Sequence, residues 1–496
     1  MRPLVHDPRE RPHHQDSAAA HVGGQRGSVG VSEQEQVRRH DQGIAVQRGR
    51  RGYVISPLDG LRAALPDAEI TWTLGAVTQA GIAALPLARL TDPVSGEPGV
   101  RARFLADSGR ELLSENRRSS DLARLGGSRP AGTTSVEVTT RYQVPEPGTV
   151  RLGVAGAGRA TLTVNGALVL ERELVHEGED FGGGLVSPPH ASALVELTAG
   201  EVELTARLDG VPQGNGLTLT LGEDPAADET DAIEAAVAAA RRAEVAVIVV
   251  GTSPEIEREA ADRATLALPG AQDALVRAVA AANPRTVVVV NAGAPVLMPW
   301  RDEVAAVLLG WFGGQEFGAA LADVLLGTAE PGGRLPTTWP AAEADVPVLA
   351  TAPVDGVVAY DEDIHIGYRA WLRAGAEPAY PFGHGLGYTS WEATGLTATS
   401  DEVSLTVRNT GERAGKQVVQ VYLSRESSAV DRPARWLAGY AVVRAGAGEA
   451  ERVTIPLARR AFQHWDGGWK TEPGEFTVHA GFSVTDLPLT TRITGP

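Results

Sequence analysis

The chain has 496 residues, of which 43% are hydrophobic and 22% charged, no cysteine and a formal net charge of −17 at pH 7. The missing thiols exclude disulfide frameworks, Cys-ligated zinc, iron–sulfur clusters and cysteine nucleophiles, and the negative charge disfavours nucleic acid and anionic membranes as partners. The length predicts roughly three domains, and because neither a run of 18 apolar residues nor a secretory signal occurs, no membrane segment and a cytoplasmic location are expected.

Residues 1–52 are predicted to be a disordered leader. They contain no aromatic residue and a single Leu and Ile, Leu4 and Ile44, so they cannot bury enough apolar surface to offset the entropy of ordering. A histidine cluster gives them an alternative interpretation as a metal site: His6, His13, His14 and His21.

Residues 53–93 and 224–390 are predicted to form one α/β domain, split by an insertion. Strands are expected at 69–73, 245–250, 286–291 and 304–309, and helices at 58–65, 233–243, 270–282 and 316–326. Alternation of helices with continuous β-branched strands is typical of a parallel sheet covered on both faces. Its functional edge should lie at the carboxyl ends of the strands, in the loops after Val250, Asn291 and Leu309.

The insertion, residues 94–223, and the last segment, residues 391–496, are each predicted to be an antiparallel β-sandwich. In the insertion, eight short runs alternate with Gly, Pro and Asn, and Asn165-Gly166 favours a tight hairpin. In the last segment, strands are expected at 403–409, 417–423, 436–443, 451–456 and 474–481, a spacing that fits an immunoglobulin-like sandwich. The fold class is therefore multidomain, α/β plus all-β.

An acidic loop follows the strand that ends at Val250. Its charged residues are Glu255, Glu257, Arg258, Glu259, Asp262 and Arg263, and Leu266-Ala267-Leu268-Pro269-Gly270 comes next. Such a charge run is often only a solvated surface. Its position at the carboxyl end of a buried strand instead favours a functional loop, since open α/β sheets place their chemistry there.

This loop resembles the second domain of family-three glycoside hydrolases, the β-glucosidases and β-xylosidases, where an acidic loop ends in Glu-Gly-x-Asp-Arg before Leu-x-Leu-Pro-Gly and a helix with Gln. Further segments match in the same order: 291–300, 310–316, 331–340, 367–369 and 380–388. The departures are Ala260 for Gly, Gly313 for Pro and Ile256 where Trp is common. The resemblance covers residues 53–496, including a protective-antigen-like insert and a fibronectin type III-like last domain.

The resemblance implies a retaining β-glycosidase with Glu259 as general acid/base, supported by Glu255, Glu257, Asp262 and Arg263. Such hydrolysis needs a second carboxylate about 5–5.5 Å away, which the family takes from a Ser/Thr-Asp-Trp motif in an N-terminal (β/α)₈ barrel of roughly 250 residues. Neither Ser-Asp-Trp nor Thr-Asp-Trp occurs in this chain. No nucleophile is therefore predicted in this chain. No cofactor or metal site is predicted either.

Two functional classes follow. The first is a β-glucosidase-like enzyme that acts on β-linked oligosaccharides or on aryl and alkyl glycosides. This chain would be inactive alone and would depend on a separate barrel chain. Without the barrel, the surface left uncovered is expected to cause self-association. The second is a non-catalytic carbohydrate-binding or scaffold protein. Trp300, Trp311 and Trp339 are interpreted as packing residues rather than sugar platforms, and His384 as a hydrogen-bonding turn residue rather than a catalyst. Asp361, Glu362 and Asp363 are contiguous, unlike a calcium loop.

Overall fold

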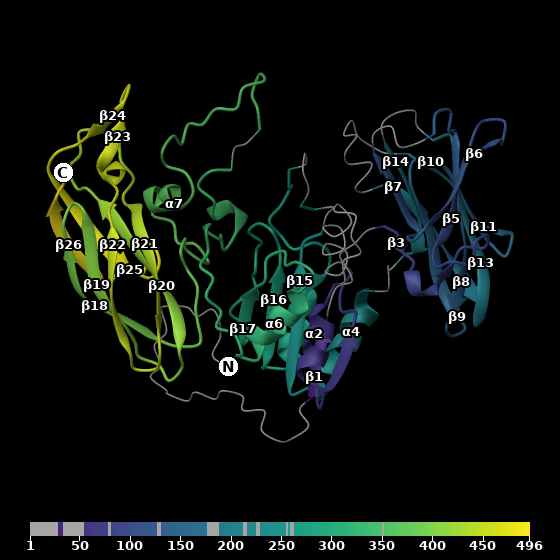
Figure 1. Ribbon diagram of the computed structural model, residues 1–496, viewed down its shortest axis with the longest axis horizontal. Coiled ribbons are helices and arrows are strands. Elements are labelled where there is room, and N and C mark those ends of the chain that lie inside the picture. The colour runs from purple at the N-terminus through teal and green to yellow at the C-terminus, as the bar shows by residue number, and fades with distance from the viewer. Residues whose placement is uncertain are drawn as a thin grey trace. The chain divides into compact units, whose positions relative to one another are not determined.

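The computed structural model describes ten segments of the chain, which fall into two compact units (Figure 1). The described segments are residues 28–32, 54–77, 81–125, 130–175, 188–211, 216–224, 229–253, 256–257, 262–349 and 352–496. One unit comprises Met1–Gly75, Ile233–Gly251 and Ala264–Pro496, and the other comprises Ala76–Ala232 and Thr252–Arg263. Among the described helices, none has the length and apolar character needed to cross a membrane.

The first unit contains a five-stranded parallel sheet with the strand order β17-β16-β15-β1-β2. Its strands are β1 (Ser28–Ser32), β2 (Glu69–Thr73), β15 (Val245–Gly251), β16 (Thr286–Asn291) and β17 (Ala306–Leu309). Every residue of β16 is buried, as expected for a valine-rich strand covered on both faces. The predicted bounds of β2 and β16 are confirmed to the residue.

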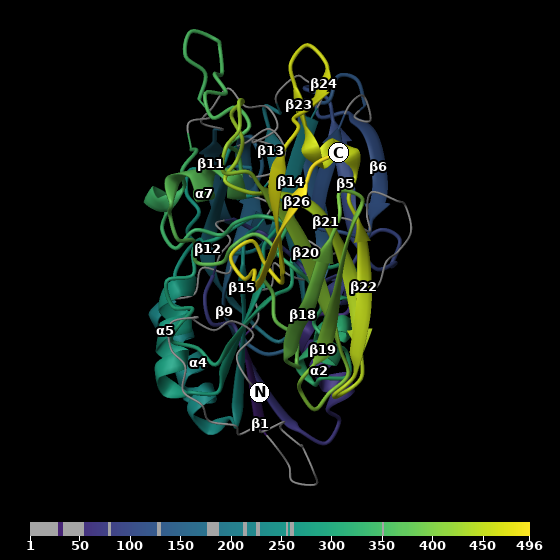
Figure 2. The ribbon, with the colours of Figure 1, turned by 90° about the vertical axis from the view of Figure 1, so that its left-hand side faces the viewer.

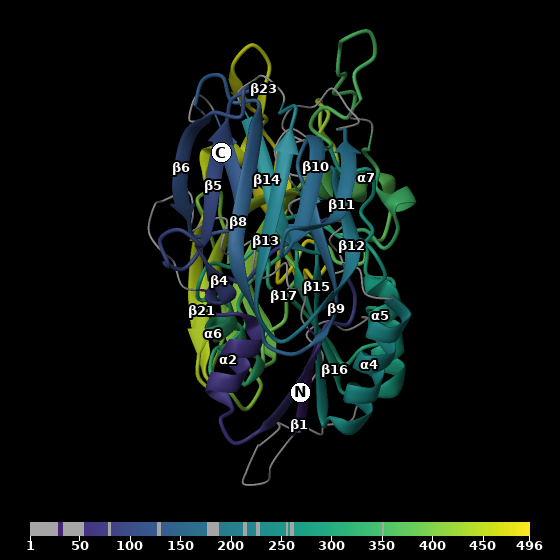
Figure 3. The same cartoon turned by 90° about the vertical axis from the view of Figure 1, so that its right-hand side faces the viewer.

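Helices flank this sheet on both sides: α2 (Pro57–Ala64) and α6 (Phe317–Leu325) lie on one face, α4 (Glu229–Arg242) and α5 (Gln272–Ala282) on the other (Figures 2 and 3). Helix α2 starts with a capping box, in which the Ser56 hydroxyl accepts a hydrogen bond from the Asp59 N–H at 3.1 Å while Asp59 accepts one from the Ser56 N–H. Where α2 meets α6, a Cβ atom on Gly60 would collide with the Gly318 backbone. The two helices therefore cross at glycine.

Strand β1 shows that the predicted disordered leader is wrong for Ser28–Ser32. This segment lies between β2 and β15 and pairs in parallel with both. The prediction failed because it rested on the composition of 52 residues, which hides a five-residue Ser-Val-Gly-Val-Ser strand that is stabilised by ladders on both of its edges. The other residues of the predicted leader, including the four histidines, lie outside the described part of the chain.

The inserted sandwich consists of two antiparallel sheets around one core. The first is β11-β10-β13-β8-β5-β6 with β4 against β8, and the second is β12-β9-β14-β3 with β7 against β14. The strands are β3 (Ala83–Ala84), β4 (Leu90–Thr91), β5 (Val100–Leu105), β6 (Glu111–Arg117), β7 (Asp121–Leu125), β8 (Ser135–Val144), β9 (Gly148–Ala155), β10 (Gly158–Val164), β11 (Ala167–Leu174), β12 (His190–Leu197), β13 (Gly200–Asp209) and β14 (Gly216–Glu223). Asn165 and Gly166, both at positive φ, turn β10 into β11, which confirms the predicted hairpin.

The predicted start of the insertion at residue 94 is too late. β3 and β4 already pair with strands of the sandwich, and the compact unit begins at Ala76. Two-residue strands show no alternation in sequence, which is why they were missed. Nearby, the buried carboxylate of Asp92 accepts hydrogen bonds from Arg101 at 2.5 and 3.1 Å and from Asn116 at 3.0 Å. This cluster fastens the entry of the insertion to β5 and β6.

The last domain is a sandwich of the sheets β18-β19-β22 and β21-β20-β25-β26, with a separate hairpin β23–β24. Its strands are β18 (Trp391–Ala398), β19 (Glu402–Asn409), β20 (Gly415–Ser424), β21 (Trp436–Ala445), β22 (Ala450–Pro456), β23 (Gln463–Trp465), β24 (Trp469–Thr471), β25 (Glu475–Gly481) and β26 (Leu489–Thr494). The five predicted strands are confirmed with small changes at their ends. The domain shares its compact unit with the α/β domain.

Candidate active site

Three neighbouring strands of the parallel sheet end at one edge, at Gly251, Asn291 and Leu309. Gly251 pairs with Asn291, and Val290 pairs with Leu309. Because all three strands run in parallel, their carboxyl ends form the edge at which α/β sheets place functional loops. Asn291 is buried there, and its Oδ1 has no hydrogen-bond partner among the described residues.

Gln272, the first residue of α5, fixes the end of β15. The Gln272 side chain is fully buried; its Oε1 accepts from the Gly251 N–H at 2.7 Å, and its Nε2 donates to the Gly251 and Pro269 carbonyls at 2.9 and 2.8 Å. These bonds close the segment between Gly251 and α5 at its base. The glutamine of the family pattern is thus a structural anchor for the loop's two ends.

Of the predicted site residues, Glu259 and Glu255 lie outside the described residues. Glu257, Asp262 and Arg263 are described. Glu257 accepts a hydrogen bond from the Thr252 hydroxyl at 2.8 Å and pairs with the Arg263 guanidinium at 3.5 Å, with both side chains 12% exposed. Asp262 is exposed. Glu257 therefore holds the loop together.

The start of this loop is a tight turn. The N–H groups of Ile256 and Glu257 both donate to the Ser253 carbonyl at 2.9 Å, and Thr252 and Ser253 are buried. Thr252–Arg263 belongs to the same compact unit as the inserted sandwich. The Glu257–Arg263 ion pair joins the two residues that flank the segment 258–262, and this segment contains Glu259 in sequence.

Glu343 is an anchor that the sequence reasoning missed. Its Oε1 accepts a hydrogen bond from the Thr265 hydroxyl at 2.7 Å and another from the Leu266 N–H. It therefore fixes the beginning of the Leu-x-Leu-Pro-Gly run from a short 3₁₀ turn, Glu343–Asp345. No sequence signal points to it, since the two partners lie far apart in the chain and Glu343 belongs to no motif.

The tryptophans behave as predicted for packing residues at two of three positions. Trp300 and Trp339 are 0% and 1% exposed. The indole N–H of Trp300 donates to Asp273 at 2.7 Å; burial raises the pKa of Asp273, and this bond opposes the rise. Trp311 is half-buried, with a left-handed backbone (φ 54°), and packs edge-to-face on Trp339 at a centroid distance of 6.1 Å.

His384 lies in a turn, as predicted, but its hydrogen bonds there are made by the backbone, and its ring Nε2 has no hydrogen-bond partner among the described residues. Its carbonyl accepts from the Leu335 N–H at 2.8 Å, its N–H donates to Pro381 at 3.1 Å, and its ring stacks on Tyr380 with centroids 5.5 Å apart. Burial, with a smaller contribution from the Arg334 charge, lowers the pKa of His384 to about 4. The imidazole is therefore neutral at neutral pH.

An open groove of about 540 Å³, lined mainly by apolar atoms, begins where β17 ends. Its lining runs from Leu308 through Gly310 and Gly313 to Phe317 and Val324 on α6. Exposed apolar side chains also occur between residues 352 and 366, among them Val354 at 74% and Tyr360 at 77% exposed. No three described His, Cys, Asp or Glu side chains are grouped to hold a metal ion.

The chain resembles known proteins over most of its length. Residues 14–388 match the family model of the glycosyl hydrolase family 3 C-terminal domain, and residues 417–484 match a fibronectin type III-like domain. A probable β-glucosidase K from Emericella nidulans is 32% identical over 463 residues, and a β-glucosidase from Rhizobium radiobacter is 33% identical over 475. These matches take in 88% and 89% of this chain but only 55% and 56% of the relatives.

Solved structures give the same result. The crystal structure of a β-glucosidase from Kluyveromyces marxianus in complex with glucose superposes with a TM-score of 0.81 at 28% identity, covering 95% of this chain and 58% of that one. A β-glucosidase from Streptomyces venezuelae in complex with D-glucose gives a TM-score of 0.63 at 30% identity, covering 95% and 56%. The chain thus spans somewhat more than half the length of the proteins it resembles.

Proposed function

The chain belongs to glycosyl hydrolase family 3, and we propose that it supplies the acid/base half of a β-glucosidase-like site that hydrolyses terminal β-linked sugars with retention. The observation that carries the proposal is the acidic loop after β15, closed by the Glu257–Arg263 pair on either side of the segment with Glu259. In this proposal Glu259 donates a proton to the leaving glycosidic oxygen and then deprotonates the attacking water.

The contacts of the acidic loop support different roles for Glu257 and Glu259. Glu257 already has two partners, Thr252 and Arg263. The Glu257 carboxylate is thus engaged within the protein, whereas a general acid must be free to reach the leaving oxygen of the substrate. Glu257 is therefore suited to shaping the loop, and the proton-transfer role falls to Glu259. Glu255 is proposed as a supporting residue, and the exposed Asp262 likewise.

The second carboxylate must come from outside this sequence. We propose that a (β/α)₈ barrel, in a separate chain or elsewhere in a longer protein, supplies the nucleophile and covers the groove that begins at Leu308. Without the barrel, the chain is expected to self-associate. A cytoplasmic location stays a prediction from the sequence.

The test is reconstitution. The purified chain is mixed with a separately produced barrel from a family relative, and hydrolysis of cellobiose and of nitrophenyl β-glucoside is measured. The chain alone should show no turnover above background, because an acid without a nucleophile cannot form the glycosyl-enzyme intermediate. The mixture should be active, and Glu259→Gln should reduce cellobiose hydrolysis about 10²–10⁴-fold.

Leaving-group ability and matched variants separate the roles. Glu259→Gln should affect nitrophenyl β-glucoside much less than cellobiose, since nitrophenolate leaves without protonation, and the alkaline limb of the pH–rate profile should disappear. Glu255→Gln and Glu257→Gln serve as controls with mild effects. Equal damage from Glu257→Gln, with an unchanged melting temperature, would move the acid/base to Glu257. Ordinary turnover by the isolated chain would refute the need for a barrel, and binding of glucan without any reconstituted activity would favour the non-catalytic class.

A further inference from the structure

Two exposed tryptophans face each other on a small hairpin of the last domain. Strands β23 and β24 pair Trp465 directly with Trp469, and the Asp466-Gly467-Gly468 turn joins them. The indole centroids lie 5.3 Å apart at an interplanar angle of 71°, and the residues are 64% and 48% exposed. The hairpin projects from one end of the sandwich (Figures 1 and 2). Large aromatic side chains left in water at a projecting tip usually mark a binding site.

The polar groups beside this indole pair favour a neutral ligand. The Lys470 ammonium forms an ion pair with the Asp466 carboxylate across the hairpin, so the two charges largely cancel while both keep hydrogen-bonding capacity. The Arg460 guanidinium lies 3.5 Å from the ring centroid of Trp469 and is thereby engaged in a cation–π contact. Arg460 covers one face of Trp469, and the apolar indole surface that remains exposed is bordered by the Asp466–Lys470 pair. Such a surface suits a neutral polyol.

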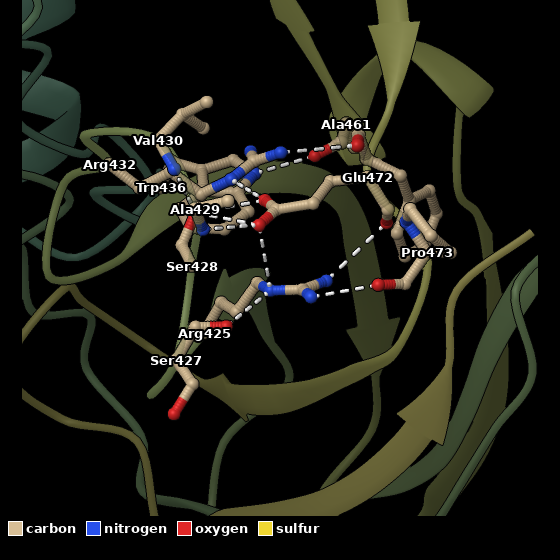
Figure 4. A network of polar contacts seen from close by, with 11 residues as sticks. Arg425, Ser427, Ser428, Ala429, Val430, Arg432, Trp436, Ala461, Glu472 and Pro473 are labelled. Carbon is tan, nitrogen blue, oxygen red and sulfur yellow. Dashed lines mark hydrogen bonds and ion pairs between the residues drawn. The ribbon is translucent and has the colours of Figure 1, made fainter.

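The base of the hairpin is rigid. Glu472, which directly follows β24, is 7% exposed and accepts hydrogen bonds from the Arg432 Nε at 2.8 Å, the Ser428 hydroxyl at 2.9 Å and the Ala429 N–H at 2.8 Å (Figure 4). Burial opposes ionisation of Glu472, but these hydrogen bonds together with the Arg425 charge outweigh it and lower its pKa. Arg432 also donates to the Phe462 carbonyl, directly before β23, at 3.3 Å.

Arg432 therefore contacts the chain on both sides of the hairpin, at Phe462 and at Glu472. The indole N–H of Trp436 adds a bond to the Ala461 carbonyl at 2.8 Å (Figure 4). A site whose backbone is fixed in advance loses less conformational entropy on binding. The two tryptophans are thus presented on a preorganised support.

We propose that Trp465 and Trp469 form a second saccharide-binding site, specific for β-linked glucan chains. The hydroxyls of a β-linked glucosyl unit are equatorial, so its axial C–H groups give each ring an apolar face that can lie on an indole. Asp466 and Lys470 then hydrogen-bond to the hydroxyls at the ring edge. The choice of β-linked glucan rests on the proposed function, because a β-glucosidase gains from holding its substrate chain on a neighbouring domain.

Binding is tested with the full chain by native electrophoresis through gels that contain barley β-glucan, with dextran, an α-glucan, as the comparison polymer. The β-glucan should retard the wild-type chain and dextran should not. Trp465→Ala and Trp469→Ala should each weaken binding about tenfold, as expected for the loss of one aromatic stack, and Trp465→Phe should retain most of it. Tyr440→Ala is the matched control, since Tyr440 is 65% exposed on β21 and outside the hairpin.

Circular dichroism and sedimentation velocity accompany the gels. No retardation of the wild-type chain, or equal loss in Tyr440→Ala, overturns the proposal. The proposal is also overturned if the wild-type chain is a dimer that Trp465→Ala converts to a monomer without changing β-glucan binding. The indoles would then form a contact between two copies of the chain. Glu259→Gln should bind β-glucan like the wild type. If the reconstituted mixture shows no activity, only the proposed function is refuted. Retardation of the tryptophan variants by β-glucan tests the second binding site separately.

Discussion

Gln272 and Gly251 form a closed pair of hydrogen bonds in which the glutamine side chain acts as an additional strand partner for the last residue of β15. Its amide accepts from the Gly251 N–H at 2.7 Å and donates to the Gly251 carbonyl at 2.9 Å. The geometry imitates a backbone ladder at the point where the sheet ends and the acidic loop begins. The loop's starting position is thereby set by a side chain on α5.

Gln272→Leu should lower the free energy of unfolding by about 2 kcal/mol, because buried backbone groups at Gly251 and Pro269 lose their partner. Chemical denaturation of the full chain measures this change. Arg277→Leu on the same helix is the control; that side chain is about half exposed, and its replacement should change stability by less than about 0.5 kcal/mol. Equal stability of Gln272→Leu and wild type would show that the pair contributes nothing.

Gly60→Ala should separate α2 from α6. A Cβ at this position would meet the Gly318 carbonyl, which is backbone and cannot rotate away. Overpacking of this kind typically costs about 1–3 kcal/mol. Thermal unfolding is the measurement, and Gly314→Ala is the control, since nothing lies within 4 Å of the new Cβ there. A melting temperature unchanged by Gly60→Ala would mean that the helices can shift apart freely.

The Asp92 cluster should make the inserted sandwich sensitive to strong acid. Burial opposes ionisation, but hydrogen bonds from Val94, Ser95, Asn116 and Arg101 outweigh it and lower the pKa of Asp92 from 3.8 to about 2. Because the folded pKa is below the unfolded one, the stabilisation is complete above pH 3.8 and is lost as the pH falls toward 2.

Asp92→Asn should remove this acid dependence and, at pH 7, lower the free energy of unfolding by about 3 kcal/mol, since Arg101 loses its buried partner. Near-UV circular dichroism against pH follows the transition. The exposed Asp107→Asn is the matched control in the same sheet. A variant with wild-type stability at pH 7 would contradict the assigned role.

His384 should give the α/β domain a milder sensitivity at higher pH. Its folded pKa is about 4 against an ordinary value of 6.5, so the unfolded chain takes up a proton between these values and the folded chain does not. Stability should therefore fall as the pH decreases from 6.5 toward 4. His384→Phe keeps the ring on Tyr380 and should flatten this dependence in urea titrations at pH 7 and pH 5. The exposed His190→Gln should leave it intact.

The sequence was most informative where hydrophobic periodicity and length agree. Strand β16 was predicted to the residue because its buried valine run ends at a polar residue, Asn291. Strand β1 was missed because its five residues lie in a segment of opposite composition. β18 and β26, which flank the last sandwich, were missed because their exposed faces dilute the apolar pattern.

The residues of the candidate site were predicted only where they lie in contiguous sequence motifs. Contiguous motifs identified the acidic loop and Gln272, whereas Glu343 could not be found because its hydrogen bonds to Thr265 and Leu266 depend only on folding. The contacts of Glu257 with Thr252 and Arg263 likewise could not be predicted from the sequence, because they depend on how the loop folds.

The interior position of β1, between β15 and β2, constrains the order in which the domains can form during synthesis. β1 pairs with β15, and the whole inserted sandwich lies between them in the chain. Residues 76–232 can therefore fold on the ribosome as a contiguous unit. β1 and β2 cannot complete their sheet until β15 has been synthesised. Long-range pairing of this kind is slow and leaves strand edges exposed. We expect nascent chains that stop before residue 245 to contain a protease-resistant insert and a protease-sensitive β1.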